Sequence, residues 1–504
     1  MISFIASVIL LIVGYIFYGA IVEKNFAPDD RQTPAYAIND GVDYIPMPLW
    51  KVYLIQLLNI AGTGPIFGAL AGAVFGPVVY LWIVFGCIFA GAVHDYMCGM
   101  LSVRNNGASV SEITGKYLGY WPLQIMRVFS VILLVMCAVV FTIGPAGLLN
   151  KITPEQYDIH FWYWVILVYY FIATFVPIDK VIGKIYPLFG FCLIAMAIGV
   201  SGSLLIYTPE KMPEIWNNMG NLHPKGLPIW PFMFITVACG AISGFHSTQS
   251  PMMARCIKSE KQGRIVFYGA MISEGLIALV WAAGGVSCYE NTTHLLEAFK
   301  PENGAVAGIV YNICETTMGK VGFLLAMLGV IACPVTSGDT AYRSARLTIA
   351  DWFKIDQSNL KKRLYVTLPL LIAGYIIGQC DYNVVWRYFS WSNQTLATIV
   401  LWACSVYLLK EKKNWLITVI PATIMTAVVT AYFMAAPECM GLIWAKLPEN
   451  SYMHNNYYGF AVFCGIVMAL TADSLFHYHK HKLQTQEEID KEDKEAKKET
   501  IQLF

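Results

Sequence analysis

Long apolar runs separated by short polar segments cover most of the chain. A helix needs about 20 apolar residues to cross a bilayer, and most of the runs reach that length. One stretch, 304–316, is too short to span and is predicted to be a surface or re-entrant helix. The others predict thirteen membrane-spanning helices, at residues 2–21, 48–76, 77–103, 123–149, 161–178, 185–207, 227–253, 264–289, 319–350, 364–380, 382–409, 414–436 and 457–478. The pattern is typical of an all-α polytopic membrane protein built as one integral domain.

Two of these runs are interrupted in the middle by small, polar and helix-breaking residues. The first contains Asn59-Ile-Ala-Gly-Thr-Gly-Pro65, and the second contains Ser243-Gly-Phe-His-Ser-Thr-Gln-Ser-Pro251. An unpaired backbone group is costly in hydrocarbon, so an unwound segment at membrane depth must line a cavity. Interrupted helices in corresponding positions of two halves indicate a transporter with a substrate site near the bilayer midplane. The glycines that follow the first interruption, Gly68, Gly72 and Gly76, are attributed to close helix packing instead.

The interruptions also divide the chain into two halves. Residues 48–207 contain five predicted spans that begin with the first interruption, and residues 227–409 contain five that begin with the second. An odd number of spans reverses the direction of the chain, so the halves are predicted to be inverted repeats, as in leucine-transporter-like (LeuT-like) carriers. One extra helix at 1–22 and two peripheral helices at 414–478 lie outside this core. The charged tail, 479–504, is predicted to be a solvated helix or disordered.

Lysine and arginine gather in alternate loops. One set contains Lys24, Arg31, Arg104, Lys116, Lys180, Lys184, Arg255, Lys258, Lys261, Arg264, the segment Arg343 to Arg363, Lys410, Lys412 and Lys413. The opposite set contains only Lys151, Lys211, Lys225, Lys300 and Lys446. Because cytoplasmic loops are enriched in positive residues, we expect the N-terminus outside the cell and the C-terminus in the cytoplasm.

Composition excludes several classes of protein. The 504 residues are 57% hydrophobic and 13% charged, which excludes a soluble globular protein. The net charge is +1 and the basic residues are spread over loops, which excludes a nucleic-acid partner. The 13 cysteines lie mostly in apolar runs without CxxC pairs, so we expect small buried core residues.

The two interruptions supply the candidates for substrate binding. Gly62 and Gly64 permit backbone conformations that other residues avoid, and the half-helix after Pro65 presents its positive end to a carboxylate. His246 either donates a charge-assisted bond to a carboxylate or takes part in a proton route, with structural hydrogen bonding as the alternative. The full set of substrate-binding candidates is Asn59, Gly62, Thr63, Gly64, Ser243, Gly244, Phe245, His246, Ser247 and Gln249.

Ionisable groups inside the predicted spans are candidates for ion or proton coupling. His94 and Asp95 are adjacent, and such groups suit proton coupling, although they also brace helices. Asp339 and Arg343 are four residues apart on one helix face, so an internal ion pair is expected, with coupling as the alternative. A weak metal set of His94, Asp95, His246 and Asp339 lacks any short ligand spacing, so no metal site is firmly expected.

Two further groups of polar residues lie in the second half. Thr336 and Ser337 occupy the place where LeuT-like carriers complete a sodium site with carbonyls of the first broken helix, here residues 60–63. The last core span contains Arg387, Trp391, Asn393 and Gln394, and with Arg343 these are candidates for gating or structural hydrogen bonds.

Several of these motifs occur together in one known family. They are Asn59-Ile-Ala-Gly-Thr-Gly-Pro-Ile-Phe-Gly68, Gly91-Ala-Val-His-Asp95 followed by Ser102-Val-Arg104, Ser243-Gly-Phe-His246, Thr336 to Arg346 continuing to Ala350-Asp351, and Trp391-Ser-Asn-Gln-Thr-Leu-Ala397. In this order, over residues 48–409, the chain resembles the carbon starvation protein A (CstA) family of inner-membrane transporters. The resemblance implies a bacterial inner-membrane protein of the amino acid–polyamine–organocation (APC) superfamily. It also implies uptake of a peptide or of pyruvate, driven by a cation gradient.

The sequence therefore predicts cation-coupled secondary uptake of a small organic nutrient by alternating access. No cofactor is expected, and the coupling ion is H⁺ or Na⁺. No HExxH or GxSxG motif is present, so an enzyme is not expected. The expected partners are the small-molecule substrate and the lipid bilayer, and the oligomeric state is left open. The alternative is a membrane nutrient sensor or receptor with a transporter-like core, which the short tail without signalling motifs disfavours.

Overall fold

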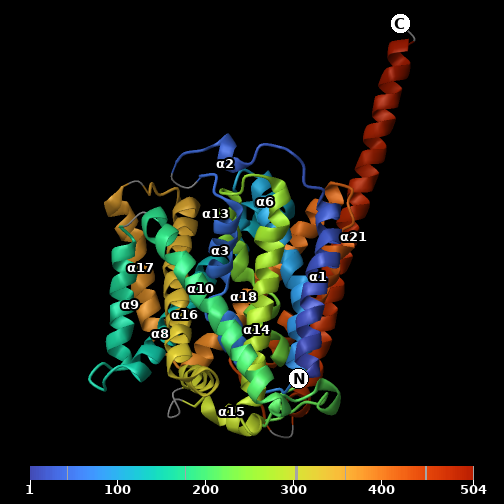
Figure 1. Ribbon diagram of the computed structural model, residues 1–504. Helices are drawn as coiled ribbons and strands as arrows, with labels where there is room; N and C mark the ends of the chain where they lie inside the picture. The colour runs from blue at the N-terminus through green and yellow to red at the C-terminus, as the bar shows by residue number, and fades with distance from the viewer. Residues whose placement is uncertain (42–43, 176–177, 301–304, 358, 449–450, 503–504) are drawn as a thin grey trace.

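The computed structural model describes residues 1–41, 44–175, 178–300, 305–357, 359–448 and 451–502, and these residues form helices and connecting segments without any strand (Figure 1). Residues 1–217 contain α1 (Ile2–Phe26), α2 (Pro34–Ala37), α3 (Leu49–Ile60), η1 (Gly64–Gly68), α4 (Ala69–Ala73), α5 (Val79–Leu81), η2 (Trp82–Gly91), α6 (Ala92–Arg104), α7 (Val110–Leu118), α8 (Tyr120–Ile152), α9 (Ile159–Ala173), α10 (Ile178–Tyr207), η3 (Pro209–Lys211) and η4 (Ile215–Asn217).

The rest of the described chain has the same all-helical character. It contains η5 (Ile229–Met233), α11 (Phe234–Thr236), α12 (Ala238–Ala241), α13 (Gly244–Ala254), η6 (Glu260–Gln262), η7 (Arg264–Gly269), α14 (Ala270–Ser287), α15 (Thr292–Ala298), α16 (Ala305–Phe353), α17 (Leu360–Ile377), α18 (Tyr382–Lys410), α19 (Leu416–Ala435), α20 (Gly441–Trp444) and α21 (Tyr452–Gln502).

The predicted count of thirteen spans is not confirmed. Eight described helices are long and apolar enough to cross a membrane, and the bent pair α3 and η1–α4 makes nine. The other four predicted spans fall on elements that do not meet these criteria of length and composition. The α9 helix has only 15 residues, the run 227–253 is broken into pieces, and the 18-residue α17 includes Lys361, Lys362 and Arg363. The fourth, α16, carries the charged residues Asp339, Arg343 and Arg346 along its second half.

A glycine separates the short apolar stretch before residue 319 from the span that follows it. Gly319 has φ 61° and ψ −170° inside α16, so the helix changes direction there. A positive φ is a conformation that glycine adopts at little cost. Residues 305–318 are therefore a helical segment distinct from the long helix after them, and residue 304 lies outside the described residues.

The helices form one bundle with the two termini at opposite ends (Figure 1). The α16 helix packs against α8 and α10, and the α19 helix packs against α21. The tail predicted for 479–504 is helical as far as Gln502, and α21 projects beyond the bundle (Figure 1). We call the end of the bundle with α2 the α2 end, and the end with α15 and the N-terminus the α15 end.

A buried ion pair closes the α2 end. The Glu260 carboxylate is fully buried and accepts two hydrogen bonds from Arg104, both at 3.0 Å. The Arg104 guanidinium also donates to the Tyr407 hydroxyl at 2.7 Å and lies 4.0 Å from the centre of the Phe26 ring. Arg31 makes a longer contact with Glu260, at 3.5 Å. These contacts join α1, α6, η6 and α18, so four elements distant in sequence are held together at this end.

Candidate functional site

The first predicted interruption is a break in the structure, inside the interval 59–65. The α3 helix ends at Ile60, Ala61 takes a non-helical ψ of 54°, and the following η1–α4 segment is bent by 52° from α3. The carbonyls freed at this break are paired by α16. Ser337 donates to the Leu58 carbonyl at 3.1 Å, and the Cys333 thiol donates to the Ala61 carbonyl at 3.1 Å. The break is therefore stabilised by hydrogen bonds from the second half of the chain.

The two hydroxyls of the predicted sodium site, those of Thr336 and Ser337, have different partners. Ser337 reaches the first break, whereas the Thr336 hydroxyl donates to the Cys333 carbonyl of its own helix at 2.8 Å. The Ser337 hydroxyl thus contacts the Leu58 carbonyl, outside the 60–63 carbonyls that were predicted to bind sodium, and the sodium site stays a prediction. Asn59 is buried in the last turn of α3, and Thr63 is buried with no hydrogen-bond partner for its hydroxyl among the described residues.

The second break lies earlier than predicted. Val237 has a non-helical ψ of 60°, and Ile242 and Ser243 are extended, but residues 244–254 form the helix α13. The prediction that 243–251 is unwound is therefore wrong for all but its first residue. Pro251 is tolerated inside α13 because the Ser247 carbonyl, which loses its backbone partner there, accepts the Cys98 thiol at 3.7 Å.

Two amides of α18 satisfy the backbone at this second break. The Asn393 side-chain carbonyl accepts the Phe245 backbone N–H at 2.6 Å and the Ser243 hydroxyl at 3.2 Å. Gln394 donates to the Phe234 carbonyl at 2.6 Å. Because these groups cap the two helix ends that face the break, Asn393 and Gln394 hold its geometry.

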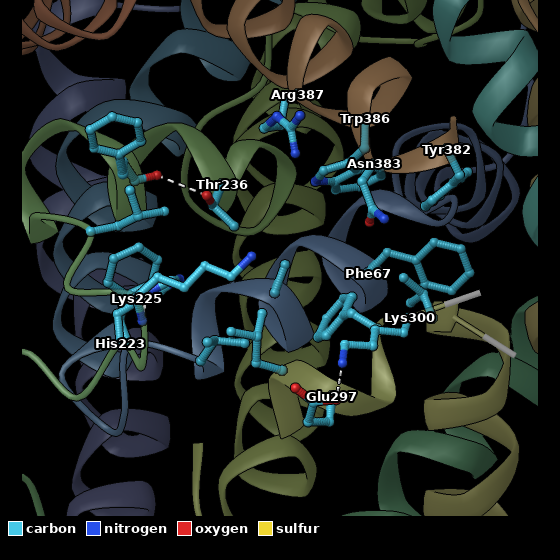
Figure 2. A pocket seen from close by; sticks show the side chains of 18 of the residues that line it. Phe67, His223, Lys225, Thr236, Glu297, Lys300, Tyr382, Asn383, Trp386 and Arg387 are labelled. Atoms are coloured by element: carbon cyan, nitrogen blue, oxygen red, sulfur yellow. Dashed lines mark hydrogen bonds and ion pairs between the residues drawn. The ribbon is translucent and has the colours of Figure 1, made fainter. Parts of the chain in front are cut away.

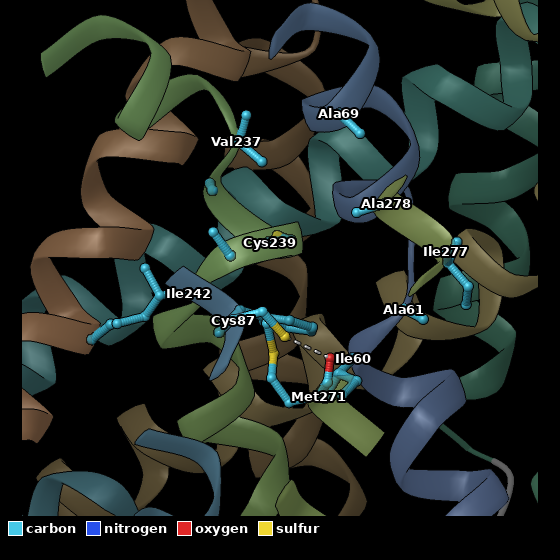
Figure 3. Packing of buried hydrophobic residues seen from close by; sticks show 14 of the residues in the cluster. Ile60, Ala61, Ala69, Cys87, Val237, Cys239, Ile242, Met271, Ile277 and Ala278 are labelled. Atoms are coloured by element: carbon cyan, nitrogen blue, oxygen red, sulfur yellow. Dashed lines mark hydrogen bonds between the residues drawn. The ribbon is translucent and has the colours of Figure 1, made fainter. Parts of the chain in front are cut away.

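The two breaks pack directly against each other. The α12 segment contacts η1, and Figure 3 shows Val237 and Cys239 of the second broken segment in the same packed cluster as Ile60, Ala61 and Ala69 of the first. A Cβ atom on Gly64 would lie 2.3 Å from the Cys239 sulfur. The close approach of the two segments therefore requires glycine at this position.

Gly64→Ala is expected to lower the free energy of unfolding by about 1–3 kcal/mol, because the added methyl overlaps Cys239. The double variant Gly64→Ala with Cys239→Gly removes the overlapping atoms and should recover most of the loss. Gly202→Ala is the control, since a Cβ there meets nothing within 4 Å. Thermal unfolding of the purified proteins measures all three. Equal melting temperatures for Gly64→Ala and Gly202→Ala would contradict the direct packing of the breaks.

Four buried ionisable side chains meet beside the second break. Asp95 of α6 lies between two histidines, with His94 Nδ1 at 2.8 Å from one oxygen and His246 Nδ1 at 2.7 Å from the other. The other ring nitrogen of His246, Nε2, lies 3.1 Å from Glu274 of α14. All four side chains are 0% exposed. We call His94, Asp95, His246 and Glu274 the buried ionic cluster.

The geometry of the buried ionic cluster constrains its protons. Both ring nitrogens of His246 face carboxylates, so the ring carries two N–H groups and a positive charge when both carboxylates are ionised. Two carboxylates and one imidazolium leave a net negative charge in a site without water access, which is costly. An added proton removes that charge. Glu274 Oε1 and His94 Nε2 have no hydrogen-bond partner among the described residues, so both atoms are available to a proton.

Sequence reasoning found three members of the buried ionic cluster and missed Glu274. Glu274 is the lone acid inside the apolar run of α14, and an isolated acid in a membrane span is itself a signal of function. The prediction for His246 also needs revision. Both of its ring nitrogens contact acids of the protein, so in this conformation neither faces a cavity.

The other predicted site residues lie apart from the buried ionic cluster. Asp339 and Arg343 form the expected ion pair at 3.3 Å. Arg387 pairs with Glu438 at 3.1 Å, and the Trp391 indole donates to the Val429 carbonyl of α19. Gly244 packs against the α18 backbone, Ser247 and Thr248 bond back to carbonyls of α13, and Gln249 donates to Thr248. In the described residues no three His, Cys, Asp or Glu side chains are placed to hold a metal ion.

A cavity of about 330 Å³ at the α15 end extends to η1 and α11, the helical segments next to the two breaks (Figure 2). Phe67 of η1 and Thr236 of α11 line it, one from each broken segment. Its walls are mostly apolar, with Phe232 and Trp386 among them, and its polar groups include Lys225. The molecule is therefore hollowed toward η1 and α11 from the α15 end, and the Glu260 ion pair holds four elements together at the α2 end.

A family model described as carbon starvation protein CstA matches residues 1–161, 151–286 and 303–432. The chain belongs to the CstA family. An uncharacterized membrane protein of Haemophilus influenzae is 44% identical in an alignment of 348 positions that covers 59% of this chain and 94% of that protein. The peptide transporter CstA of Escherichia coli is 24% identical in an alignment of 563 positions, gaps included, that covers 86% of this chain and 80% of that protein. The E. coli pyruvate/proton symporter BtsT is 26% identical in an alignment of 340 positions that covers 55% of this chain and 47% of that protein.

Solved structures share the fold of this CstA-family chain. MhsT in complex with L-phenylalanine has a TM-score of 0.55 at 12% identity, covering 85% of this chain and 98% of that chain. A mutant of the Eremococcus coleocola manganese transporter has a TM-score of 0.52 at 12% identity, covering 88% and 98%. Both neighbours are LeuT-like transporters. The chain thus has a LeuT-like fold with eight or nine apolar helices long enough to cross a membrane among its described residues, and its named family relatives are transporters and not enzymes.

Proposed function

We propose that this protein takes up a small carboxylate nutrient, pyruvate or a peptide, together with a proton. The observation that carries the proposal is the buried ionic cluster, which joins α6, α13 and α14 beside the second break. Relatives in the family are named peptide transporters and a pyruvate/proton symporter, which supports the substrate class and the ion. Sodium coupling through Ser337 has less support, because that hydroxyl contacts the Leu58 carbonyl directly.

The difference between the two ends of the bundle supports transport by alternating access. By the distribution of lysine and arginine, the α15 end faces outside and the α2 end faces the cytoplasm of a bacterial inner membrane. The substrate enters through the cavity at the α15 end, and its carboxylate reaches backbone N–H groups near residues 62–66. The two inverted halves, 48–207 and 227–409, then move against each other. Opening the cytoplasmic side requires the Glu260–Arg104 pair to separate, and protonation of the buried ionic cluster accompanies the change.

Reconstituted vesicles test the coupling. With an inward proton gradient, they should accumulate labelled pyruvate or a labelled dipeptide, and a protonophore should reduce the uptake to the level of empty vesicles. Replacing sodium by potassium at fixed membrane voltage should leave the uptake unchanged, because no sodium is required. Loss of uptake in potassium would contradict proton coupling. Binding without accumulation would instead support a nutrient sensor.

A further inference from the structure

We propose that Lys225 is a specificity residue at the mouth of the cavity, which attracts the substrate carboxylate and rejects neutral analogues. This inference rests on the proposed function, because it assigns the step that precedes occupation of the broken helices. It goes beyond that function by naming the group that reads the charge of the substrate. No motif in the sequence marks this lysine.

Lys225 reaches into the cavity from the segment between α10 and η5. Figure 2 shows its side chain extended across the hollow, toward Arg387 and Asn383, which come from α18 on the far side. A ligand between these groups would meet a cation and an amide donor at once. Carboxylates are bound by this combination of groups.

The other lysine and arginine residues that line the cavity are in ion pairs, whereas Lys225 has none among the described residues. Lys300 pairs with Glu297, and Arg387 pairs with Glu438. Among the described residues, no carboxylate forms an ion pair with Lys225. Of the lysine and arginine residues that line the cavity at the α15 end, Lys225 is therefore the one without an ion-pair partner among the described residues.

His223 adds no charge to the cavity near neutral pH. Burial and the neighbouring Lys225 ammonium hold the pKa of His223 below its ordinary value. Its Nδ1 atom accepts the backbone N–H of Lys225 at 3.2 Å, which a doubly protonated ring cannot do. Lys225 therefore acts alone at the pH where transport is measured.

Lys225 lies in a loop on the side of the membrane where lysine and arginine are scarce. Basic residues are scarce in the loops expected outside, where the sequence has only Lys151, Lys211, Lys225, Lys300 and Lys446. Two of these, Lys225 and Lys300, line the cavity that extends to η1 and α11. Apolar walls of Phe67, Phe232 and Trp386 strengthen the field of a charge in such a cavity and raise the local concentration of anions.

Transport kinetics of the full-length protein in vesicles test the role of Lys225. Lys225→Met should raise the KM for pyruvate about tenfold at low ionic strength with little change in kcat, and added salt should shrink the difference. Lys225→Arg should keep the KM near the original value, since it keeps the charge. Lys211→Met is the control, because Lys211 is on the same side but does not line the cavity. An unchanged KM in Lys225→Met would overturn the proposal.

A second experiment requires no transport. Asn383→Cys, made together with Cys380→Ser to remove an exposed native thiol, places a reporter in the cavity. The measured quantity is the ratio of the modification rates by an anionic and by a cationic methanethiosulfonate reagent. This ratio should be about tenfold higher for the reporter than for a free thiol in solution. Lys225→Met should abolish that preference, whereas Lys211→Met should not. The Cys380→Ser protein without the reporter gives the background.

The two experiments separate the failure of each proposal. If vesicles accumulate no carboxylate but the reagent preference depends on Lys225, the proposed function fails and the anion site stands. If vesicles accumulate pyruvate with an unchanged KM in Lys225→Met, the proposed function stands and the assignment of Lys225 fails. A reagent preference that is the same with and without Lys225 also overturns the assignment.

Discussion

Glu274→Gln is expected to abolish accumulation of substrate driven by a proton gradient, while exchange of labelled for unlabelled substrate across the vesicle membrane persists. Glutamine keeps the shape of the side chain and its place beside His246, but it cannot take up and release a proton. Exchange moves no net proton, so it does not need that step. Uptake with and without a pH gradient, measured in the same vesicles, checks both halves of the prediction.

Glu290→Gln is the matched control for Glu274→Gln. Glu290 follows α14 and is exposed, 83% for its side chain, and its ion-pair partner is His294. Its replacement should change neither accumulation nor exchange. Gradient-driven accumulation by Glu274→Gln at the original level would remove Glu274 from the coupling step. Loss of exchange as well, in a protein of unchanged melting temperature, would place Glu274 in substrate binding instead.

Arg104→Leu is expected to lower the free energy of unfolding by about 3–5 kcal/mol. It removes both hydrogen bonds at 3.0 Å from Glu260, which is fully buried and would keep only the Asp29 backbone N–H, at 3.0 Å, and the longer Arg31 contact among the described residues. Arg31→Leu is the matched control and should cost less than about 1 kcal/mol, because that side chain is half exposed and its contact is 3.5 Å. Thermal unfolding in detergent compares the two variants with the original protein.

The outcome of this comparison bears on the proposed closed side of the transporter. A large loss for Arg104→Leu and a small one for Arg31→Leu would support a lock made by one residue pair. Similar losses for both variants would mean that the charges at the α2 end act as a diffuse group, and the assignment of Glu260–Arg104 as the closing contact would be wrong.

The fold was largely predictable because bilayer thickness imposes a length on apolar runs. The first break was also predictable, since Gly62, Gly64 and Pro65 all oppose a regular helix at the same place. The second break was misplaced because Pro251 and the polar residues near it suggested unwinding. The sequence could not show that the Cys98 thiol, from a distant helix, compensates for the hydrogen bond that Pro251 lacks.

The buried ionic cluster shows the same limit of local reasoning. His94, Asp95 and His246 were each identified from their polar character inside apolar runs, but their separate roles were left open. Only the fold brings α6, α13 and α14 together and gives Asp95 its two histidine partners. Glu274 stands alone in its apolar run, so no group of neighbouring polar residues marks it in the sequence.

The contact between Cys98 and Ser247 also bears on how α13 can move. At 3.7 Å, a thiol bonded to a carbonyl is weaker than the peptide hydrogen bond it replaces, and it joins two different helices. The helix can therefore bend at Pro251 for little energy, and His246 lies one turn before it. The proline would serve as a hinge that swings the imidazole away from Asp95, so that motion of a half-helix and transfer of a proton become a single event.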